Sequence, residues 1–159
     1  MDLLLWRHAH ALDAQPGQPD MERPLSKKGM QQAKAMAVWL NKHLPSETAI
    51  FVSPSQRTMQ TVAHLERPYT LSESIRPDAQ ADDVLTLAGW PFQSTSTVLV
   101  VAHQPFLSDT VAKCLALPTD HGLSFRKGAV WWLRHRLSDG HSHAFLWAVM
   151  DPQLLNSRF

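Results

Sequence analysis

The stretch "LLLWRHAHA" (Leu3–Ala11) joins a short apolar run to a cluster of arginine and histidine side chains. Four consecutive apolar residues, Leu3–Trp6, are typical of a strand that is buried on both faces of a parallel sheet. Arg7 and His8 follow directly, so we expect them at the carboxyl end of that strand. Ligands of open α/β sheets bind just beyond this end of the strands, so the stretch predicts both a fold class and the position of a site.

The rest of the chain alternates between short apolar runs and helical patterns. "TVLVVA" (Thr97–Ala102) is β-branched and apolar throughout, which predicts a second buried strand. Apolar residues recur every three or four positions in Ser26–Leu44, which predicts an amphipathic helix with Ser26 as its N-cap. Further strands are predicted at Thr48–Ser53 and Tyr69–Glu73, and further helices at Gln56–Leu65, Asp82–Ala88 and Phe106–Leu117.

The last third of the chain carries a hairpin pattern. "GAVWWLRHRL" and "HAFLWAVM" flank the turn residues Ser138, Asp139 and Gly140. Strands that alternate with helices favour parallel pairing, so the predicted fold class is α/β. We expect a three-layer α/β/α domain with a mostly parallel central sheet and an antiparallel edge hairpin, as a single domain over residues 1–159. Asp13–Pro24 is rich in Pro, Gly, Gln and Asp, which predicts a loop.

Composition excludes several classes of protein. The chain has 159 residues, of which 44% are hydrophobic, and this suits a globular domain. A net charge of +1 gives no basic field for nucleic acid, so no nucleic-acid partner is expected. No apolar run approaches the roughly 18–20 residues of a membrane helix, and no signal-peptide pattern is present. Cys114 is the single cysteine, so an internal disulfide is excluded and a cytoplasmic location is expected.

The basic and imidazole side chains follow three different predicted strands. Arg7 and His8 follow the first strand, Arg57 lies just past the second, and His103 follows "TVLVVA". Because parallel strands end at one edge of a sheet, we expect the four side chains to meet there. Guanidinium groups match phosphate oxygens, and an imidazole can act as a nucleophile. The set therefore predicts phosphoryl chemistry without a metal or cofactor.

Four motifs occur in order: "RHAHA" (Arg7–Ala11), "RPLSKKG" (Arg23–Gly29), "SPSQRTMQT" (Ser53–Thr61) and "VVAHQP" (Val100–Pro105). Together they resemble the histidine phosphatase (phosphoglycerate mutase-like) superfamily. The short chain and the "RPL" segment are similar to the SixA-type phosphohistidine phosphatases of that superfamily. The superfamily usually has glycine where this chain has Ala9, a small change if the φ angle at this position is negative.

The resemblance implies a role for each matching residue. His8 would be the nucleophile that forms a phosphohistidine intermediate, and Arg7 and Arg57 would bind the phosphoryl oxygens. His103 would be the second histidine in contact with the same group. Many members place a glutamate in a Leu-x-Glu pattern after the third strand, and "LSE" puts Glu73 there as a candidate general acid. The superfamily needs no metal or cofactor for this reaction.

The expected substrate is a phosphohistidine on another protein, such as a histidine phosphotransfer domain. A small-molecule phosphomonoesterase with the same site is the main alternative. A non-catalytic phosphate-binding module is a second alternative, although binding alone has no need of a nucleophile. A third is a metal-binding protein built on the pairs His8/His10 and His141/His143. The sequence does not predict the oligomeric state.

Overall fold

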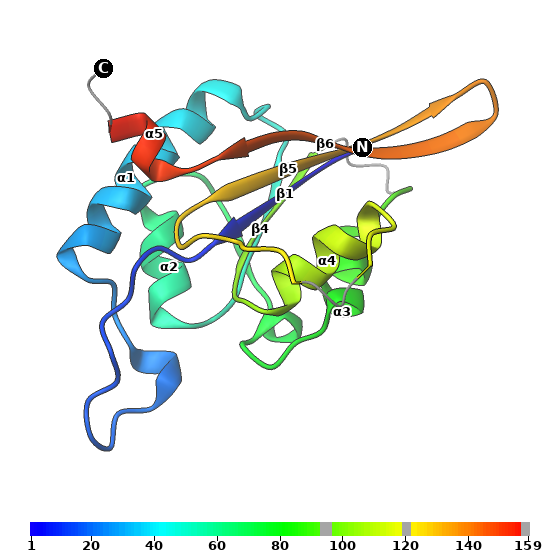
Figure 1. Ribbon diagram of the computed structural model, residues 1–159. Helices are drawn as coiled ribbons and strands as arrows, with labels where there is room; N and C mark the ends of the chain where they lie inside the picture. Colours follow the sequence, from blue (N-terminus) through cyan, green and yellow to red (C-terminus); the bar gives the residue numbers. More distant parts are fainter. Residues whose placement is uncertain (93–96, 119–121, 157–159) are drawn as a thin grey trace.

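The centre of the fold is a mixed β-sheet. The computed structural model describes residues 1–92, 97–118 and 122–156, and within them the sheet has six strands in the order β3-β2-β4-β1-β5-β6 (Figure 1). The strands are β1 (Asp2–Arg7), β2 (Ala49–Val52), β3 (Thr70–Leu71), β4 (Thr97–Ala102), β5 (Val130–Ser138) and β6 (His141–Met150). The pairs β1/β4, β2/β4 and β2/β3 are parallel, whereas β1/β5 and β5/β6 are antiparallel. The predicted sheet, mostly parallel with an antiparallel edge hairpin, is confirmed.

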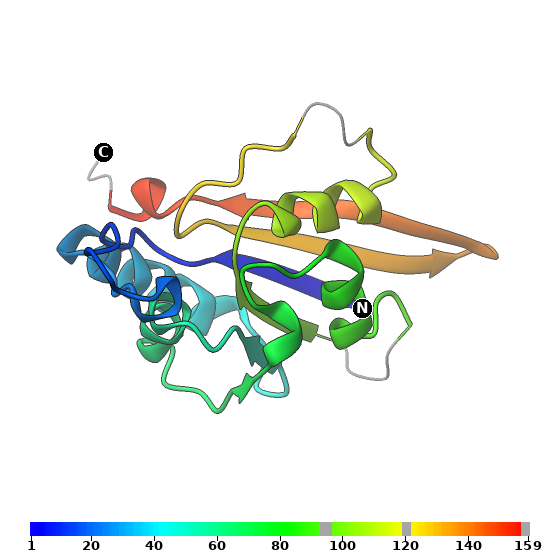
Figure 2. The same cartoon turned by 90° about the horizontal axis from the view of Figure 1, so that it is seen from below.

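Helices cover both faces of the sheet (Figure 2). One layer holds α1 (Lys27–His43), α2 (Gln56–Ala63) and the short α5 (Pro152–Asn156). The other holds α3 (Ala81–Ala88) and α4 (Phe106–Cys114). This is the predicted three-layer arrangement. No helix in the described part of the chain is long and apolar enough to cross a membrane.

The central strand β1 shows why its apolar run is continuous. Leu3 and Leu5 pack against the layer of α3 and α4, while Leu4 and Trp6 pack against α1 and α2. All four side chains are completely buried. Burial of one such side chain stabilises the fold by about 1.5–3 kcal/mol, so the run commits β1 to the middle of the sheet.

Three predicted elements are shorter than their sequence patterns. The third strand, β3, contains only Thr70 and Leu71, which pair with β2 at the edge of the sheet, and both side chains are exposed. Glu73 lies outside this strand and begins a 3-10 turn, η2 (Glu73–Ile75). The predicted helix Phe106–Leu117 ends at Cys114, and Ala116 has a φ of 52° that a right-handed helix does not allow. The predicted helix Gln56–Leu65 ends at Ala63, shortly before Glu66, whose φ is 54°.

Two connections between the elements have a defined backbone conformation. The hairpin turn has positive φ at both Asp139 (51°) and Gly140 (77°), as a two-residue turn between β5 and β6 requires. The loop predicted at Asp13–Pro24 contains a short 3-10 turn, η1 (Asp20–Glu22). This turn contacts α2, so the loop lies against the end of the sheet that carries the basic residues.

Candidate active site

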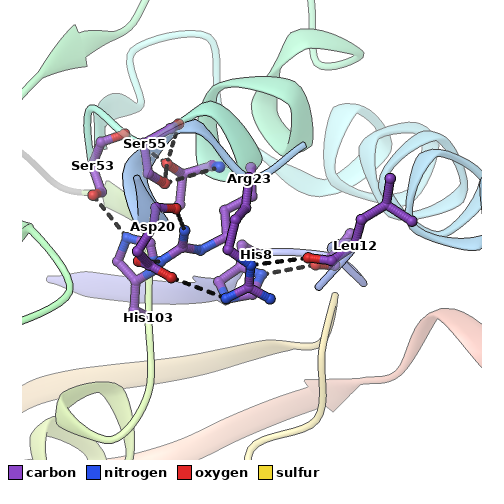
Figure 3. Close-up of polar contacts among 10 residues, drawn as sticks. His8, Leu12, Asp20, Arg23, Ser53, Ser55 and His103 are labelled. Carbon is purple, nitrogen blue, oxygen red and sulfur yellow. Dashed lines mark hydrogen bonds and ion pairs between the residues drawn. The ribbon is translucent and has the colours of Figure 1, made fainter. Parts of the chain in front are cut away.

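Three adjacent strands deliver the predicted residues to one edge of the sheet. In the order β2-β4-β1, Ser53 follows β2, His103 follows β4, and Arg7 ends β1 with His8 next to it. The ladder continues past the strands, because the His8 amide donates to the Ala102 carbonyl at 3.0 Å. The His8 and His103 rings lie 5.3 Å apart, centroid to centroid. The convergence predicted from the sequence is therefore present in the structure (Figure 3).

The protonation of the His8 ring is defined by one contact. His8 Nδ1 lies 2.8 Å from the carbonyl oxygen of Ala9, which can only accept a hydrogen bond. Nδ1 therefore carries the proton and Nε2 carries the lone pair. Burial lowers the pKa of His8 to about 4, and the charges of Arg57 and Arg7 act in the same direction. At neutral pH the ring is uncharged and Nε2 is a nucleophile.

His103 is also buried and neutral. Its Nε2 lies 2.8 Å from the Ser53 hydroxyl oxygen (Figure 3), and its ring is close to Phe106. Burial lowers the pKa of His103 to about 2, with a further lowering by the positive charge of Arg57. The site therefore combines two neutral imidazoles with two guanidinium groups.

Each of the two arginines donates a hydrogen bond to a main-chain carbonyl and has an Nε without a hydrogen-bond partner. Arg7 Nη1 donates to the Phe125 carbonyl at 2.6 Å, and burial lowers the pKa of Arg7. In the described part of the chain, Arg7 Nε, Arg57 Nε and His103 Nδ1 are buried without a hydrogen-bond partner. A buried donor left unpaired costs about 1–3 kcal/mol. The two guanidinium nitrogens are donors that an anionic ligand would satisfy, and His103 Nδ1 is a third donor if the Ser53 hydroxyl donates to Nε2.

Asp20 is a residue of this site that the sequence prediction missed. Its carboxylate Oδ2 accepts from Arg57 Nη2 at 2.8 Å, and Arg23 Nη1 donates to Oδ1 at 3.0 Å (Figure 3). Burial acts to raise the pKa of Asp20, but hydrogen bonds and charges of Arg23 and Arg57 outweigh it and the pKa is lowered. Asp20 is therefore an anion at neutral pH. The only sequence signal was an acidic residue three positions before Arg23.

The turn after β1 is fixed from two helices. The Ala9 amide donates to the Thr61 hydroxyl at 3.0 Å, and that hydroxyl donates to the Arg57 carbonyl at 2.7 Å. Ala9 is fully buried and is not among the described non-glycine residues with positive φ, so alanine fits where the superfamily has glycine. On the α1 side, the Ser26 side chain accepts from the Gly29 amide, which confirms Ser26 as the N-cap.

Two further predicted groups do not join the site. Glu73 lies in η2 with a side chain that is 74% exposed, and its carboxylate pairs with Arg76 at 2.9 Å. Among the described residues it contacts none of the two arginines and two histidines of the site, so its role as a general acid stays a prediction. His10 Nδ1 lies 2.9 Å from the Ser26 hydroxyl. The described residues contain no cluster of three or more potential metal ligands.

Comparison with known proteins identifies the family. The model of the histidine phosphatase superfamily (branch 1) matches residues 3–80, which hold β1, His8, Asp20 and Arg57. The structure of the protein histidine phosphatase SixA complexed with tungstate is similar over 98% of this chain and 100% of that chain, with a TM-score of 0.78 and 25% identity. The chain belongs to the histidine phosphatase superfamily.

Within the superfamily the fold is of the SixA type. A protein of Nakamurella multipartitia, provisionally named phosphohistidine phosphatase SixA, is similar with a TM-score of 0.77 and 26% identity over 95% of each chain. An uncharacterized protein of Mycobacterium tuberculosis is 32% identical over 102 residues, which span 62% of this chain and 64% of that relative. The alignment thus covers less than two thirds of the relative. These comparisons confirm the superfamily and fold that the four motifs predicted.

Proposed function

We propose that this superfamily member is a phosphatase in which His8 Nε2 takes a phosphoryl group from the substrate. The hydrogen bond from His8 Nδ1–H to the Ala9 carbonyl carries the proposal, because it leaves the lone pair on Nε2. The low pKa of about 4 keeps that lone pair available at neutral pH.

The reaction proceeds in two balanced displacements. Nε2 bonds to phosphorus as the bond between phosphorus and the leaving group breaks, and the His8 ring becomes a phosphorylated imidazolium because Nδ1 keeps its proton. The Ala9 carbonyl accepts from Nδ1 throughout and stabilises this positive ring. Water then bonds to phosphorus, the P–Nε2 bond breaks, and H₂PO₄⁻ leaves with both protons of the water. His8 returns to its neutral form.

The guanidinium groups supply the charge that this mechanism needs. Phosphoryl transfer depends mainly on positioning and on stabilising charge at the phosphoryl oxygens. Arg7 and Arg57 carry unpaired buried Nε donors, and His103 carries an unpaired buried Nδ1. We assign these three nitrogens to the phosphoryl oxygens, with the His103 proton on Nδ1 and His103 Nε2 accepting from the Ser53 hydroxyl. The proposed steps use no metal and no cofactor.

A protein phosphohistidine is the substrate that we propose. A phosphate ester releases an alkoxide that needs a proton, whereas the P–N bond of phosphohistidine releases an imidazole that is neutral once its ring carries a proton. The candidate acid Glu73 is highly exposed and paired with Arg76, and this favours the substrate that has less need of a general acid. The likeness to SixA, a protein histidine phosphatase, supports the same choice.

The test measures phosphate release in the presence of a chelator from two substrates, a phosphohistidine-bearing phosphotransfer domain and p-nitrophenyl phosphate. Wild type is compared with His8→Ala and with His141→Ala, an exposed histidine of the hairpin as control. Release from phosphohistidine that is lost only in His8→Ala supports the proposal. Release from the ester alone would favour the small-molecule phosphomonoesterase. Phosphate binding without release from either would favour a binding module.

A further inference from the structure

The Arg57 guanidinium is already occupied by an anionic side chain. Arg57 Nη2 donates to the Asp20 carboxylate at 2.8 Å, and Arg57 Nη1 donates to the Asp20 main-chain carbonyl at 2.6 Å. The Arg57 side chain is only 4% exposed beneath this contact. One residue of η1 therefore engages both terminal nitrogens of an arginine that the proposed function assigns to the phosphoryl group (Figure 3).

A phosphoryl group bound at Arg57 Nε would also reach the neighbouring Nη2, because a guanidinium binds an anion through two N–H groups at once, and at Nη2 it would compete with the Asp20 carboxylate. Both are anions that bind a guanidinium through its N–H groups. Two like charges about 4 Å apart repel by about 1–4 kcal/mol, for effective dielectric constants of about 80 to 20. The Asp20 charge also acts on the ring of His103, the second imidazole of the site. A phosphoryl group beside His8 would therefore meet the negative charge of Asp20.

We infer that Asp20 is a built-in competitor of the phosphoryl group for Arg57, and that it transfers to Arg23 alone when the phosphoryl group binds. This inference rests on the proposed function. Arg23 already holds the other carboxylate oxygen of Asp20 at 3.0 Å. Arg23 is itself fixed by a hydrogen bond from its Nε to the Leu12 carbonyl at 2.9 Å. The carboxylate thus has a second cation in place and can give up Arg57 without losing its charge partner.

The exchange leaves the loop in position. The main-chain contact between the Asp20 carbonyl and Arg57 Nη1 involves no carboxylate, so it persists while Nη2 changes partner. Asp20 therefore acts by competing for Arg57 Nη2, and it does not act on the phosphorus atom. Its physical effect is to weaken binding of every phosphoryl anion, the released phosphate included. Return of the carboxylate to Nη2 favours departure of the product.

The test titrates inorganic phosphate into the protein by calorimetry. Asp20→Asn keeps an oxygen that accepts from Nη2 but removes the charge, and Asp13→Asn removes one exposed charge from the same loop as a control. We expect Asp20→Asn to lower the Kd for phosphate on the order of tenfold and Asp13→Asn to leave it unchanged. The constant for product inhibition by phosphate should fall with the Kd. A Kd in Asp20→Asn equal to or above that of Asp13→Asn overturns the inference.

A second variant guards against a local folding defect. Asp20→Ala removes the carboxylate and its hydrogen bonds, and it should also bind phosphate more tightly; weaker binding in both Asp20 variants would show that the carboxylate only positions Arg57. The calorimetric readout does not depend on turnover. If the wild type releases no phosphate from the substrates but Asp20→Asn still binds inorganic phosphate more tightly, the proposed function alone is rejected. Turnover by the wild type without tighter binding would reject this inference alone.

Discussion

Replacement of Gly29 by alanine should change the free energy of unfolding in two opposite ways, through higher helix propensity and through a steric clash. Gly29 is the third residue of α1, and an alanine inside a helix is usually about 1 kcal/mol more stable than glycine. Here the new Cβ would lie 2.0 Å from the His10 carbonyl oxygen and 2.9 Å from the His10 carbonyl carbon. That carbonyl cannot easily move, because it accepts from the Ser26 amide at 2.9 Å and from the Ser26 hydroxyl at 3.2 Å. We expect the clash to win, with a net loss of about 2–4 kcal/mol.

Urea unfolding of the wild type and Gly29→Ala measures this difference. Gly17→Ala is the control, because Gly17 lies in the loop after β1 with a φ of 78° and open space around its Cα. The control should lose only about 1–3 kcal/mol from backbone strain, with unchanged affinity for phosphate. Gly29→Ala should also weaken phosphate binding, since His10 is two residues from His8. A Gly29→Ala protein as stable as the wild type would refute the reasoning.

Three more predictions follow from the site. Arg57→Ala should weaken phosphate binding by about 1.5–3 kcal/mol in a calorimetric titration, the scale of a hydrogen bond to a charged group, and unchanged binding would remove Arg57 from the pocket. The pKa of His8 falls from 6.5 to about 4 on folding, so the unfolded chain takes up the proton first. The contribution of His8 to the free energy of unfolding should be constant above pH 6.5 and should fall by about 3 kcal/mol between pH 6.5 and pH 4. Urea titrations of the wild type and His8→Asn at these pH values measure this loss, which should be smaller in His8→Asn. Glu73→Gln should keep turnover of phosphohistidine within about twofold of wild type, because an exposed ion pair contributes little; a collapse of the rate would restore Glu73 as the acid.

Continuous apolar runs made the centre of the fold predictable. Leu3–Trp6 and Thr97–Ala102 are apolar at every position or nearly so, which predicted strands buried on both faces of a parallel sheet; their pairing with each other is known only from the structure. The positions of Arg7, His8 and His103 then followed from where those strands end. The same reasoning was weaker at the edge, where β3 pairs over two residues and has no buried side chain to define its length.

Asp20 shows what local patterns leave out. It lies in a loop without periodicity, and its contact with Arg57 spans 37 residues of sequence. The loop position follows from many contacts at once, such as the Arg23 side chain on the Leu12 carbonyl. The protonated nitrogen of His8 was likewise beyond the sequence, because it depends on the direction of the Ala9 carbonyl.

The position of β1 in the sheet has a consequence for synthesis of the chain. Its two partners, β4 and β5, begin at Thr97 and Val130, long after Leu3–Trp6 has been made. At a translation rate of about 5–20 residues per second, roughly 5 to 20 s pass between synthesis of Leu3–Trp6 and synthesis of its partner strand "TVLVVA". The segment that anchors the finished sheet is thus the one that a nascent chain leaves exposed longest to chaperones and to aggregation.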